Sequence, residues 1–254
     1  MAAAAPVNSL PRLRPHLALP ALGKPYHQKL LSRFAGGIVA FYPLFETSGS
    51  LALDVSGAFR HGAYTGVSLA HAPGPRGRPA GLWDGVNDFC DIYSASLNAA
   101  FNGNEGSLLL WMRAFNAGVW SDAVLRRVVM LYSNGTNYII LAKTTASNTL
   151  QFSHAGSGSG KNAAYSGMAG NANWFHAAGT WSLSNNRIRL YVNGSQVASQ
   201  TGIGAWSGSL SSAQTLIGAT DKTPNHVWNG WLGYALLLNR EASAAEVAAA
   251  YAMR

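Results

Sequence analysis

The sequence has little charge and almost no cysteine. Asp, Glu, Lys and Arg make up 11 % of the 254 residues, against about 25 % in a typical soluble domain. Coiled coils and most helical bundles need charged residues on their solvent faces, so this composition argues against both. The single Cys90 excludes an internal disulfide and a multi-cysteine metal site, and we expect it to pack as a small buried apolar residue.

Long apolar runs are also missing. No run reaches the roughly 18 residues that a transmembrane helix needs, so no membrane span is predicted. The N-terminal 30 residues do not follow the pattern of a signal peptide, because prolines interrupt each apolar stretch and Arg12 and Arg14 come after the small residues. We therefore expect no Sec export.

The residues that are abundant favour β structure. Apolar residues make up 48 % of the chain, and 28 glycines stand among many Ser, Asn and Thr residues, which suits short strands joined by small turns. Strand-like segments follow one another without helices between them, at residues 38–44, 81–93, 107–115, 126–132, 138–143, 149–153, 173–182, 187–192, 214–217 and 230–239. This pattern predicts an all-β, two-sheet antiparallel sandwich.

Turn and cap signals refine this prediction. Asn193-Gly194 lies between two strand-like segments and predicts a hairpin with a tight turn. The glycine-rich residues 156–160 predict a flexible loop. One helix is expected, at residues 244–252, because Ser243 and Glu246 have the spacing of a capping box.

Residues 1–34, which we call the arm, differ from the rest of the chain. The arm carries five Lys or Arg residues and no acid, and it holds five of the ten prolines. Proline at this density favours an extended path, so the expected organisation is an extended arm followed by one domain at residues 35–254. The arm is predicted to lie along a neighbouring subunit through Leu10, Arg12, Leu13, Arg14, Leu17, Leu19 and Leu22; the alternative is a disordered leader. Nucleic-acid arms are usually denser in Lys and Arg, so nucleic acid is an unlikely partner.

Several motifs, in this order along the chain, resemble those of one known family. Trp-Asp-Gly-Val-Asn-Asp-Phe at residues 83–89 resembles the strand F-D-G-x-D-D-Y/F, and Leu-Tyr-Val-Asn-Gly at 190–194 resembles the hairpin L-Y-V-D/N-G. Further matches lie at residues 41–44, 54–57, 61–62, 107–113, 174–180, 216–218 and 228–240. Together they resemble laminin-G-like jelly rolls of the concanavalin A-like lectin/glucanase superfamily. The resemblance covers roughly residues 38–254 and implies a jelly-roll sandwich with an extended arm and a short C-terminal helix.

The enzymes of this superfamily need paired carboxylates, which the sequence does not offer in a suitable pattern. Glycosidases use two carboxylates set close together, and neither Glu-x-Asp nor Glu-x-x-Glu occurs among the ten acids. Asp84 and Asp88 come closest, but they match a structural turn of the family, where they are expected to tie the turn to the strand backbone. We therefore predict no enzymatic activity.

The resemblance also implies a calcium site. Asp54 matches the first ligand that laminin-G-like domains commonly use, whereas residues 231–235 lack the second acid. Ca²⁺ prefers several oxygens including carboxylates, so calcium is a possible cofactor at Asp54 and none is otherwise expected. The alternative is that Asp54 accepts hydrogen bonds from backbone N–H groups in a turn.

Tryptophan is the residue type most relevant to binding. Trp83, Trp111, Trp174 and Trp181 fall inside predicted strands and are expected in the core, whereas Trp120, Trp206 and Trp228 fall in or beside loops. The second group could stack on sugars, anchor a protein interface or close the ends of the sandwich. Arg60, Arg76 and Arg78 belong to a long Gly- and Pro-rich loop suited to contacts and not to catalysis.

These observations lead to one main hypothesis for function. A jelly roll with an extended arm suits a structural and binding protein, and jelly rolls of this family also occur in bacteriophage virions. We therefore predict a non-enzymatic virion component, such as a decoration, fibre or tail-associated protein. Its arm would dock on neighbouring virion subunits or another copy of itself, and its surface could bind glycans. The alternative is a free carbohydrate-binding or adhesion module, with or without a dependence on calcium, that reaches the outside of the cell by a non-Sec route. A glycosidase is the least favoured of the three hypotheses.

Overall fold

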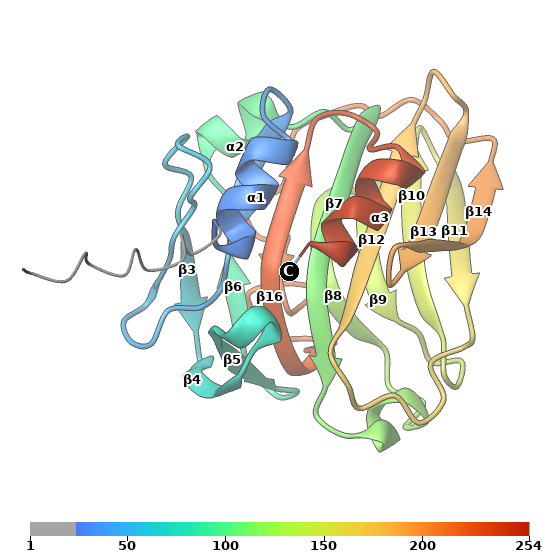
Figure 1. Ribbon diagram of the computed structural model, residues 1–254. Coiled ribbons are helices and arrows are strands. Elements are labelled where there is room, and N and C mark those ends of the chain that lie inside the picture. Colours follow the sequence, from blue (N-terminus) through green and yellow to red (C-terminus); the bar gives the residue numbers. More distant parts are fainter. Residues whose placement is uncertain (1–23, 254) are drawn as a thin grey trace, which may run out of the picture.

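The computed structural model describes residues 24–253, and within them two antiparallel sheets of eight strands pack face to face (Figure 1). Sheet A has the order β14-β13-β12-β7-β16-β5-β4, with β1 paired to β16, and sheet B has the order β11-β10-β9-β8-β15-β6-β3-β2. This arrangement confirms the predicted jelly-roll sandwich.

The strand bounds are as follows. Sheet A is built from β1 (Ile38–Tyr42), β4 (Ser68–Pro73), β5 (Pro79–Asp84), β7 (Glu105–Ala114), β12 (Phe175–Ser182), β13 (Arg187–Val192), β14 (Ser195–Thr201) and β16 (Asn229–Leu238). Sheet B is built from β2 (Leu51–Ala52), β3 (Gly62–Thr65), β6 (Phe89–Asp91), β8 (Arg126–Asn134), β9 (Asn137–Lys143), β10 (Leu150–Gly156), β11 (Ser159–Tyr165) and β15 (Thr215–Ile217). The helical segments are α1 (Tyr26–Arg33), η1 (Pro75–Gly77), α2 (Ala95–Ala100), η2 (Ala117–Trp120) and α3 (Ala244–Ala252).

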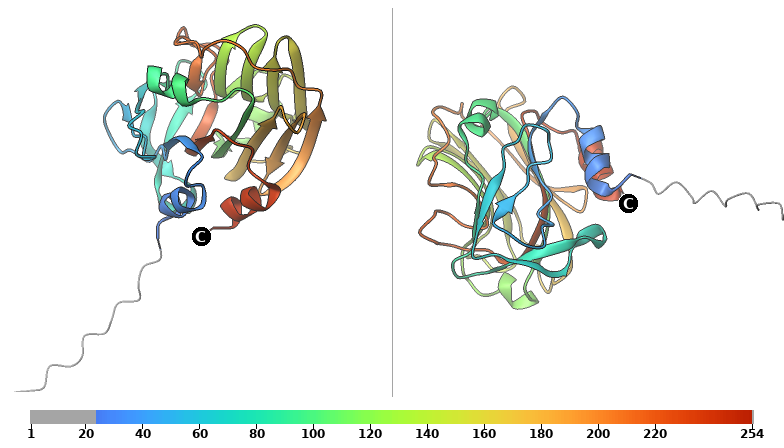
Figure 2. Two further views of the ribbon diagram at one scale, coloured as in Figure 1. Left: turned by 90° about the horizontal axis from the view of Figure 1, so that it is seen from above. Right: turned by 90° about the vertical axis from the view of Figure 1, so that its left-hand side faces the viewer.

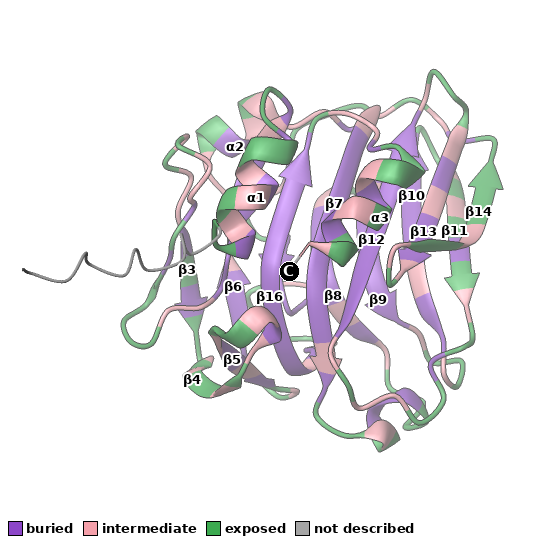
Figure 3. Ribbon diagram, viewed as in Figure 1, coloured by how far each residue is buried: buried purple, intermediate pink, exposed green. Residues whose placement is uncertain are grey.

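The main core lies between the sheets, where the inward residues of the strands meet. It contains Trp83, Phe152 and Trp181, all fully buried. Figure 3 shows that β16, β7 and β12 are buried along most of their length, whereas the edge strand β14 is exposed. Cys90 is fully buried in this core, which confirms that it packs as a small apolar residue.

Two local signals are confirmed in detail. Asn193 and Gly194 both have positive φ, at 50° and 81°, as a tight hairpin turn between β13 and β14 requires. At the start of α3, the backbone N–H of Glu246 donates to Ser243 Oγ over 3.2 Å, and the N–H of Ser243 donates to Glu246 Oε2 over 2.8 Å. The two N–H groups of the capping box therefore both have partners.

Residues 81–93 were expected to form one strand, and this prediction is wrong. The segment divides into β5 in sheet A and β6 in sheet B. Between them, Asp84 Oδ1 accepts from the N–H of Val86 over 2.7 Å, and Asp88 Oδ2 accepts from the N–H of Asp84 over 2.8 Å. The two aspartates thus tie the turn to the strand backbone as predicted, and this turn carries the chain from one sheet to the other.

Residues 156–160 do not form a long loop. Gly156 pairs with Ser159 in a hairpin that joins β10 to β11. The turn residues Ser157 and Gly158 have φ of 47° and 80°, a conformation that glycine adopts at little cost. The glycines therefore indicate a tight turn in place of the flexible loop, and sequence reasoning missed β11.

The last third of the arm is also not extended. Residues 26–33 form α1, which lies beside α3 on the outer face of sheet A (Figure 2). Tyr26, Leu30 and Phe34 are buried there at 5 %, 2 % and 0 % exposure. Burying such side chains contributes about 1.5–3 kcal/mol each, so this segment belongs to the jelly-roll domain. The predicted arm residues Leu10, Arg12, Leu13, Arg14, Leu17, Leu19 and Leu22 lie outside the described residues.

None of the helices in residues 24–253 is long and apolar enough to cross a membrane.

Candidate functional site

A pocket of about 290 Å³ opens on the outer face of sheet A, the face that carries α1 and α3. This volume is close to the lower end of the range for small-molecule sites. Its lining combines three aromatic rings with one cation and comprises Arg76, Trp111, Trp174, Tyr251 and Ala252. We call it the aromatic pocket.

Sheet register brings the pocket residues together. His176 on β12 pairs with Trp111 on β7, which pairs with Gly233 on β16, so these three residues form a row across the sheet. Phe175 pairs with Met112 in this antiparallel ladder. Trp174 therefore lies opposite the residue of β7 that follows Met112. Because residues opposite each other in an antiparallel pair share a face, Trp111 and Trp174 both point to the outer side.

Trp111 is the rigid floor of the pocket. Its Nε1 donates to Tyr26 Oη over 2.9 Å, and Tyr26 Oη donates to the carbonyl of Ala250 over 3.0 Å. This chain of bonds links the sheet to α1 and α3. Burial raises the pKa of Tyr26 to about 12, so the phenol stays protonated as the chain requires.

Two further rings form the walls. The ring of Tyr251 on α3 stacks on Trp111 with a centroid distance of 5.8 Å and an interplanar angle of 30°. Trp174 is half-buried, and its Nε1 donates to the carbonyl of Pro73 over 3.2 Å. The turn after β4 therefore holds the second indole in place while its ring lines the pocket.

Arg76 supplies the positive charge of the pocket. Its guanidinium carbon lies 4.7 Å from the ring centroid of Trp111 and 5.2 Å from that of Tyr26. Nη2 donates to the carbonyl of Tyr251, whereas Nε is buried without a hydrogen-bond partner in the part of the chain that the structure describes. The charge is fixed over the floor by cation–π contacts.

His176 lies next to the floor of the pocket in its neutral form. Burial, together with the charge of Arg76, lowers the pKa of His176 to about 3, so the ring is neutral at physiological pH. Its centroid is 5.5 Å from that of Trp111, and Nδ1 is buried with no partner among the described residues. A neutral imidazole can donate or accept a hydrogen bond here, but it does not supply a proton.

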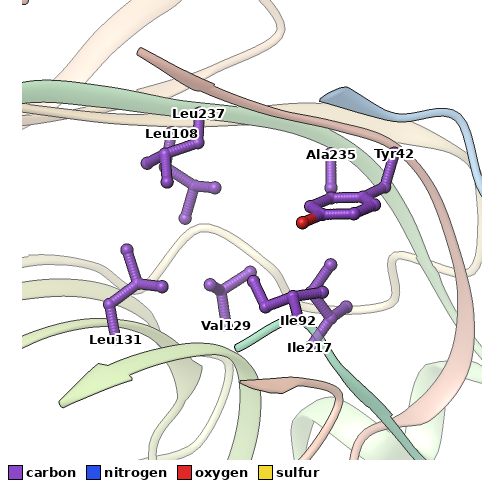
Figure 4. A pocket seen from close by; sticks show the side chains of 8 residues that line it. All are labelled: Tyr42, Ile92, Leu108, Val129, Leu131, Ile217, Ala235 and Leu237. Carbon is purple, nitrogen blue, oxygen red and sulfur yellow. The ribbon is translucent and has the colours of Figure 1, made fainter. Parts of the chain in front are cut away.

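A second hollow, between the two sheets, is not a binding site (Figure 4). Its volume is about 10 Å³, barely enough for one water molecule. The lining is apolar apart from the phenol of Tyr42, whose Oη donates to the carbonyl of Arg60 over 2.6 Å. It is a packing void of the core.

The carboxylates of the chain are used in holding the fold. Each of the ten accepts a hydrogen bond from another group of the protein: Glu46, Asp54, Asp84, Asp88, Asp91, Glu105, Asp122, Asp221, Glu241 and Glu246. In residues 24–253 no three His, Cys, Asp or Glu side chains are grouped so that they could hold a metal ion.

Asp54, the predicted calcium ligand, is buried at 4 % exposure and fully engaged. Its Oδ1 accepts from the N–H groups of Phe41 and Ser56, each over 2.9 Å, and its Oδ2 accepts from Ser56 Oγ over 2.8 Å and from the N–H of Arg60 over 2.9 Å. Four donors surround the carboxylate. The alternative interpretation, a turn acceptor, fits this geometry, and a calcium ligand does not.

The tryptophans predicted as a binding surface do not form one. Trp120 and Trp228 are fully buried, with ring centroids 6.1 Å apart. Trp206 is half-buried against the core, 5.2 Å from the ring of Phe101. Glycans and protein partners cannot reach the first two, so these residues fit the alternative that they close the sandwich. Small polar neighbours in the sequence had suggested exposure, but the surrounding loops fold over both indoles.

The aromatic pocket instead uses residues that sequence reasoning assigned elsewhere. Trp111 and Trp174 were expected in the core, and Arg76 was expected only to make contacts from a loop. Trp111 is indeed buried, at 6 % exposure, but on the outer side of sheet A. The strand period alone could have found this, since Leu110 and Met112 point inward and Trp111 must point the other way.

Comparison with solved structures agrees with the fold. The receptor-binding domain of botulinum neurotoxin mosaic serotype C/D matches with a TM-score of 0.66 and 12 % identity, over 85 % of this chain and 50 % of that one. The ligand-binding domain of botulinum neurotoxin serotype D, solved with N-acetylneuraminic acid, matches with a TM-score of 0.64 and 12 % identity, over 87 % of this chain and 52 % of that one. The chain thus spans about half the length of the toxin domains.

A third structure matches over nearly its whole length. Domain 4 of AbnA, an extracellular arabinanase of Geobacillus stearothermophilus solved with arabinotriose, has a TM-score of 0.60 and 14 % identity, over 84 % of this chain and 98 % of that one. Comparison with the curated proteins finds no match. A family model matches residues 84–248, more than half of the chain. The protein therefore belongs to the concanavalin A-like lectin/glucanases superfamily.

Proposed function

We propose that this protein binds carbohydrate and that the aromatic pocket is its binding site. The observation that carries the proposal is the pairing of two indoles, Trp111 and Trp174, in one pocket with a guanidinium at its rim. Pyranose rings present apolar C–H faces and polar edges, and a site for them needs aromatic faces together with a few polar groups. The aromatic pocket offers both.

The arabinanase domain lends support from a related fold. That chain is a single domain, and this protein covers 98 % of it. Its arabinotriose therefore lies on a domain of the same architecture. The toxin domains support the proposal less, because about half of each chain has no counterpart here, and the N-acetylneuraminic acid is not thereby placed in the shared half.

Binding without hydrolysis is the second part of the proposal. Hydrolysis needs two free carboxylates facing the scissile bond, and the pocket lining contains none. Asp84 and Asp88, the pair that came nearest to the carboxylate pattern of the enzymes, hold the turn between the sheets. Burial raises the pKa of Asp88, but this follows from its structural position and no substrate site adjoins it.

A calorimetric titration of the full chain with a panel of neutral and acidic oligosaccharides tests the proposal. Trp174→Ala should weaken binding by about tenfold or more, since stacking of an aromatic ring on an apolar face contributes roughly 1–2 kcal/mol. Phe59→Ala is the matched control, because Phe59 is 78 % exposed and does not line the pocket. If no saccharide binds, or if both variants bind as the wild type does, the proposal is wrong.

A role in a bacteriophage virion remains a separate and untested proposal. It rested on an extended arm, and residues 26–33 of that arm form a helix on the protein's own jelly roll. The other residues of the arm, 1–23, lie outside the described part of the chain. Removing residues 1–23 and measuring incorporation into particles would test it, since the domain itself should stay folded.

A further inference from the structure

The surroundings of the aromatic pocket are rich in unpaired positive charge. Arg76 lines it, Arg78 lies two residues further along the chain, and Arg113 lies on β7 two residues after Trp111. None of these three arginines forms an ion pair with the residues that the structure describes, although six other basic residues do. The ion pairs of the described carboxylates are therefore formed with other basic residues.

Arg76 differs from the other two in how it is placed. Arg78 is exposed and lies over the ring of Phe45, at 5.5 Å, and Arg113 donates through Nε to the carbonyl of Ala172 and stacks on Trp231. Arg76 is partly buried, no described carboxylate forms an ion pair with it, and its Nε has no partner among the described residues. Burying a cation without an opposite charge raises the free energy of the folded protein unless a bound ligand supplies that charge.

The contacts of Arg76 leave part of its donor set free. A guanidinium carries five N–H donors in a planar fork, and the described residues accept a hydrogen bond only from Nη2, at Tyr251. The stacking on Trp111 and Tyr26 fixes the plane of this fork. A fixed planar fork matches the two oxygens of a carboxylate better than it matches a single hydroxyl.

We infer that the aromatic pocket selects a sugar that bears a carboxylate, with the sugar ring against Trp174 and the carboxylate on Arg76. This inference rests on the proposed function and deepens it by naming the class of sugar. No carboxylate is among the described residues that line the pocket, so none of these residues repels an anionic ligand. The neutral His176 adjoins the floor and adds no charge of its own.

Matched pairs of ligands test the inference on the wild-type chain. Galacturonate is compared with galactose, glucuronate with glucose, and N-acetylneuraminic acid with its methyl ester, all by calorimetric titration. A hydrogen-bonded charge pair contributes about tenfold to a hundredfold in affinity. In at least one pair the acid should bind about tenfold or more tightly than its neutral partner, and added salt should reduce this difference.

Two charge-removing variants separate the pocket from the general positive charge. Arg76→Gln should lower the ratio of acid to neutral affinity to about one while neutral sugars still bind. Arg78→Gln removes the same charge two residues away, outside the pocket lining, and should keep the wild-type ratio within about twofold. Near-ultraviolet circular dichroism of each variant checks that the aromatic packing is unchanged.

The outcomes distinguish the inference from the proposed function. Equal binding of acids and neutral sugars, or an acid preference that survives in Arg76→Gln, overturns the inference while carbohydrate binding stands. A preference for sulfated over carboxylated sugars also overturns it. Failure of every sugar to bind overturns the proposed function, and the inference with it. The ligand pairs measured on the wild type remain decisive even if Arg76→Gln does not fold.

Discussion

The two outer faces of the sandwich are built on the same strand alternation but differ in what covers them. On sheet A, α1, α3 and the turn at residues 73–77 pack over the strands (Figures 1 and 2). The turn and α3 contribute Arg76, Tyr251 and Ala252 to the lining of the aromatic pocket. On sheet B, Met130, Ile140 and Ala142 form a small apolar cluster that is flanked by Tyr132 and Tyr138, and neither α1 nor α3 reaches it. A sheet alone offers a flat face, and the segments added to it create a pocket.

The helices also explain why the sheet A face carries so many large apolar residues. Phe41, Leu109, Tyr191 and Leu236 point outward from the strands, yet each is nearly fully buried under the covering segments. Tyr26 reaches from α1 to both Trp111 and the last turn of α3. The floor of the pocket is therefore held by three parts of the chain that are far apart in sequence.

The largest expected effect comes from uncovering the sheet A face. Phe34→Ala removes a fully buried ring just after α1, so unfolding free energy should fall by about 3–5 kcal/mol. Tyr138→Ala on the sheet B face removes a half-buried ring and should cost about 1 kcal/mol. Chemical denaturation measures both. Equal losses would mean that α1 adds little to the domain and that the two faces do not differ as described.

The next largest expected effect is on how the free energy of unfolding depends on pH. The pKa of His176 falls from 6.5 to about 3 on folding. As the pH is lowered, the imidazole is therefore protonated in the unfolded chain at a higher pH than in the folded chain. The stabilising contribution is present above pH 6.5 and is lost as the pH falls toward 3, by at most about 1.4 kcal/mol per pH unit. Between pH 6.5 and 4.5 the wild type should lose about 2–3 kcal/mol more than His176→Gln does.

Other groups titrate in the same direction, so the variant is needed as the reference. Burial lowers the pKa of His27, His154 and His226 as well. Denaturation curves of wild type and His176→Gln at several pH values isolate the single contribution. If the two proteins lose stability in parallel, His176 is not buried in its neutral form beside the pocket.

The smallest of the three effects concerns one hydroxyl. Tyr26→Phe leaves Trp111 Nε1 and the carbonyl of Ala250 without their partner, which should cost about 1–3 kcal/mol. Tyr132→Phe is the control on sheet B, because no described residue forms a hydrogen bond with the Tyr132 hydroxyl. It should be neutral within about 0.5 kcal/mol. Similar losses for both would show that the bond chain under the pocket is not structural.

Much of the fold could be predicted because its signals are local. The Asn193-Gly194 turn and the capping box at Ser243 need only a few neighbouring residues, and both are confirmed. The division of residues 81–93 between two sheets was missed because the polar residues 84–88 were taken as a turn at one end of a single strand. α1 was missed because the prolines before it suggested an extended path, whereas Pro25 directly precedes the helix and fits a helix start.

The site could not be predicted in the same way, because tertiary packing decides which tryptophans are accessible. Trp228 and Trp174 each have one Asn and one apolar neighbour in the sequence, yet one is fully buried and the other lines the pocket. The approach of Arg76 to Trp111 joins residues 35 positions apart through a turn that folds over the sheet. No local pattern encodes that contact.

A crystal structure of the full chain soaked with the tightest-binding sugar of the panel tests the central claim most directly. The account predicts density for the sugar in the aromatic pocket, with its ring against Trp174 and its charged group at Arg76. Density for the sugar on the sheet B face beside Tyr132 and Tyr138, with the aromatic pocket unoccupied by sugar, would contradict it.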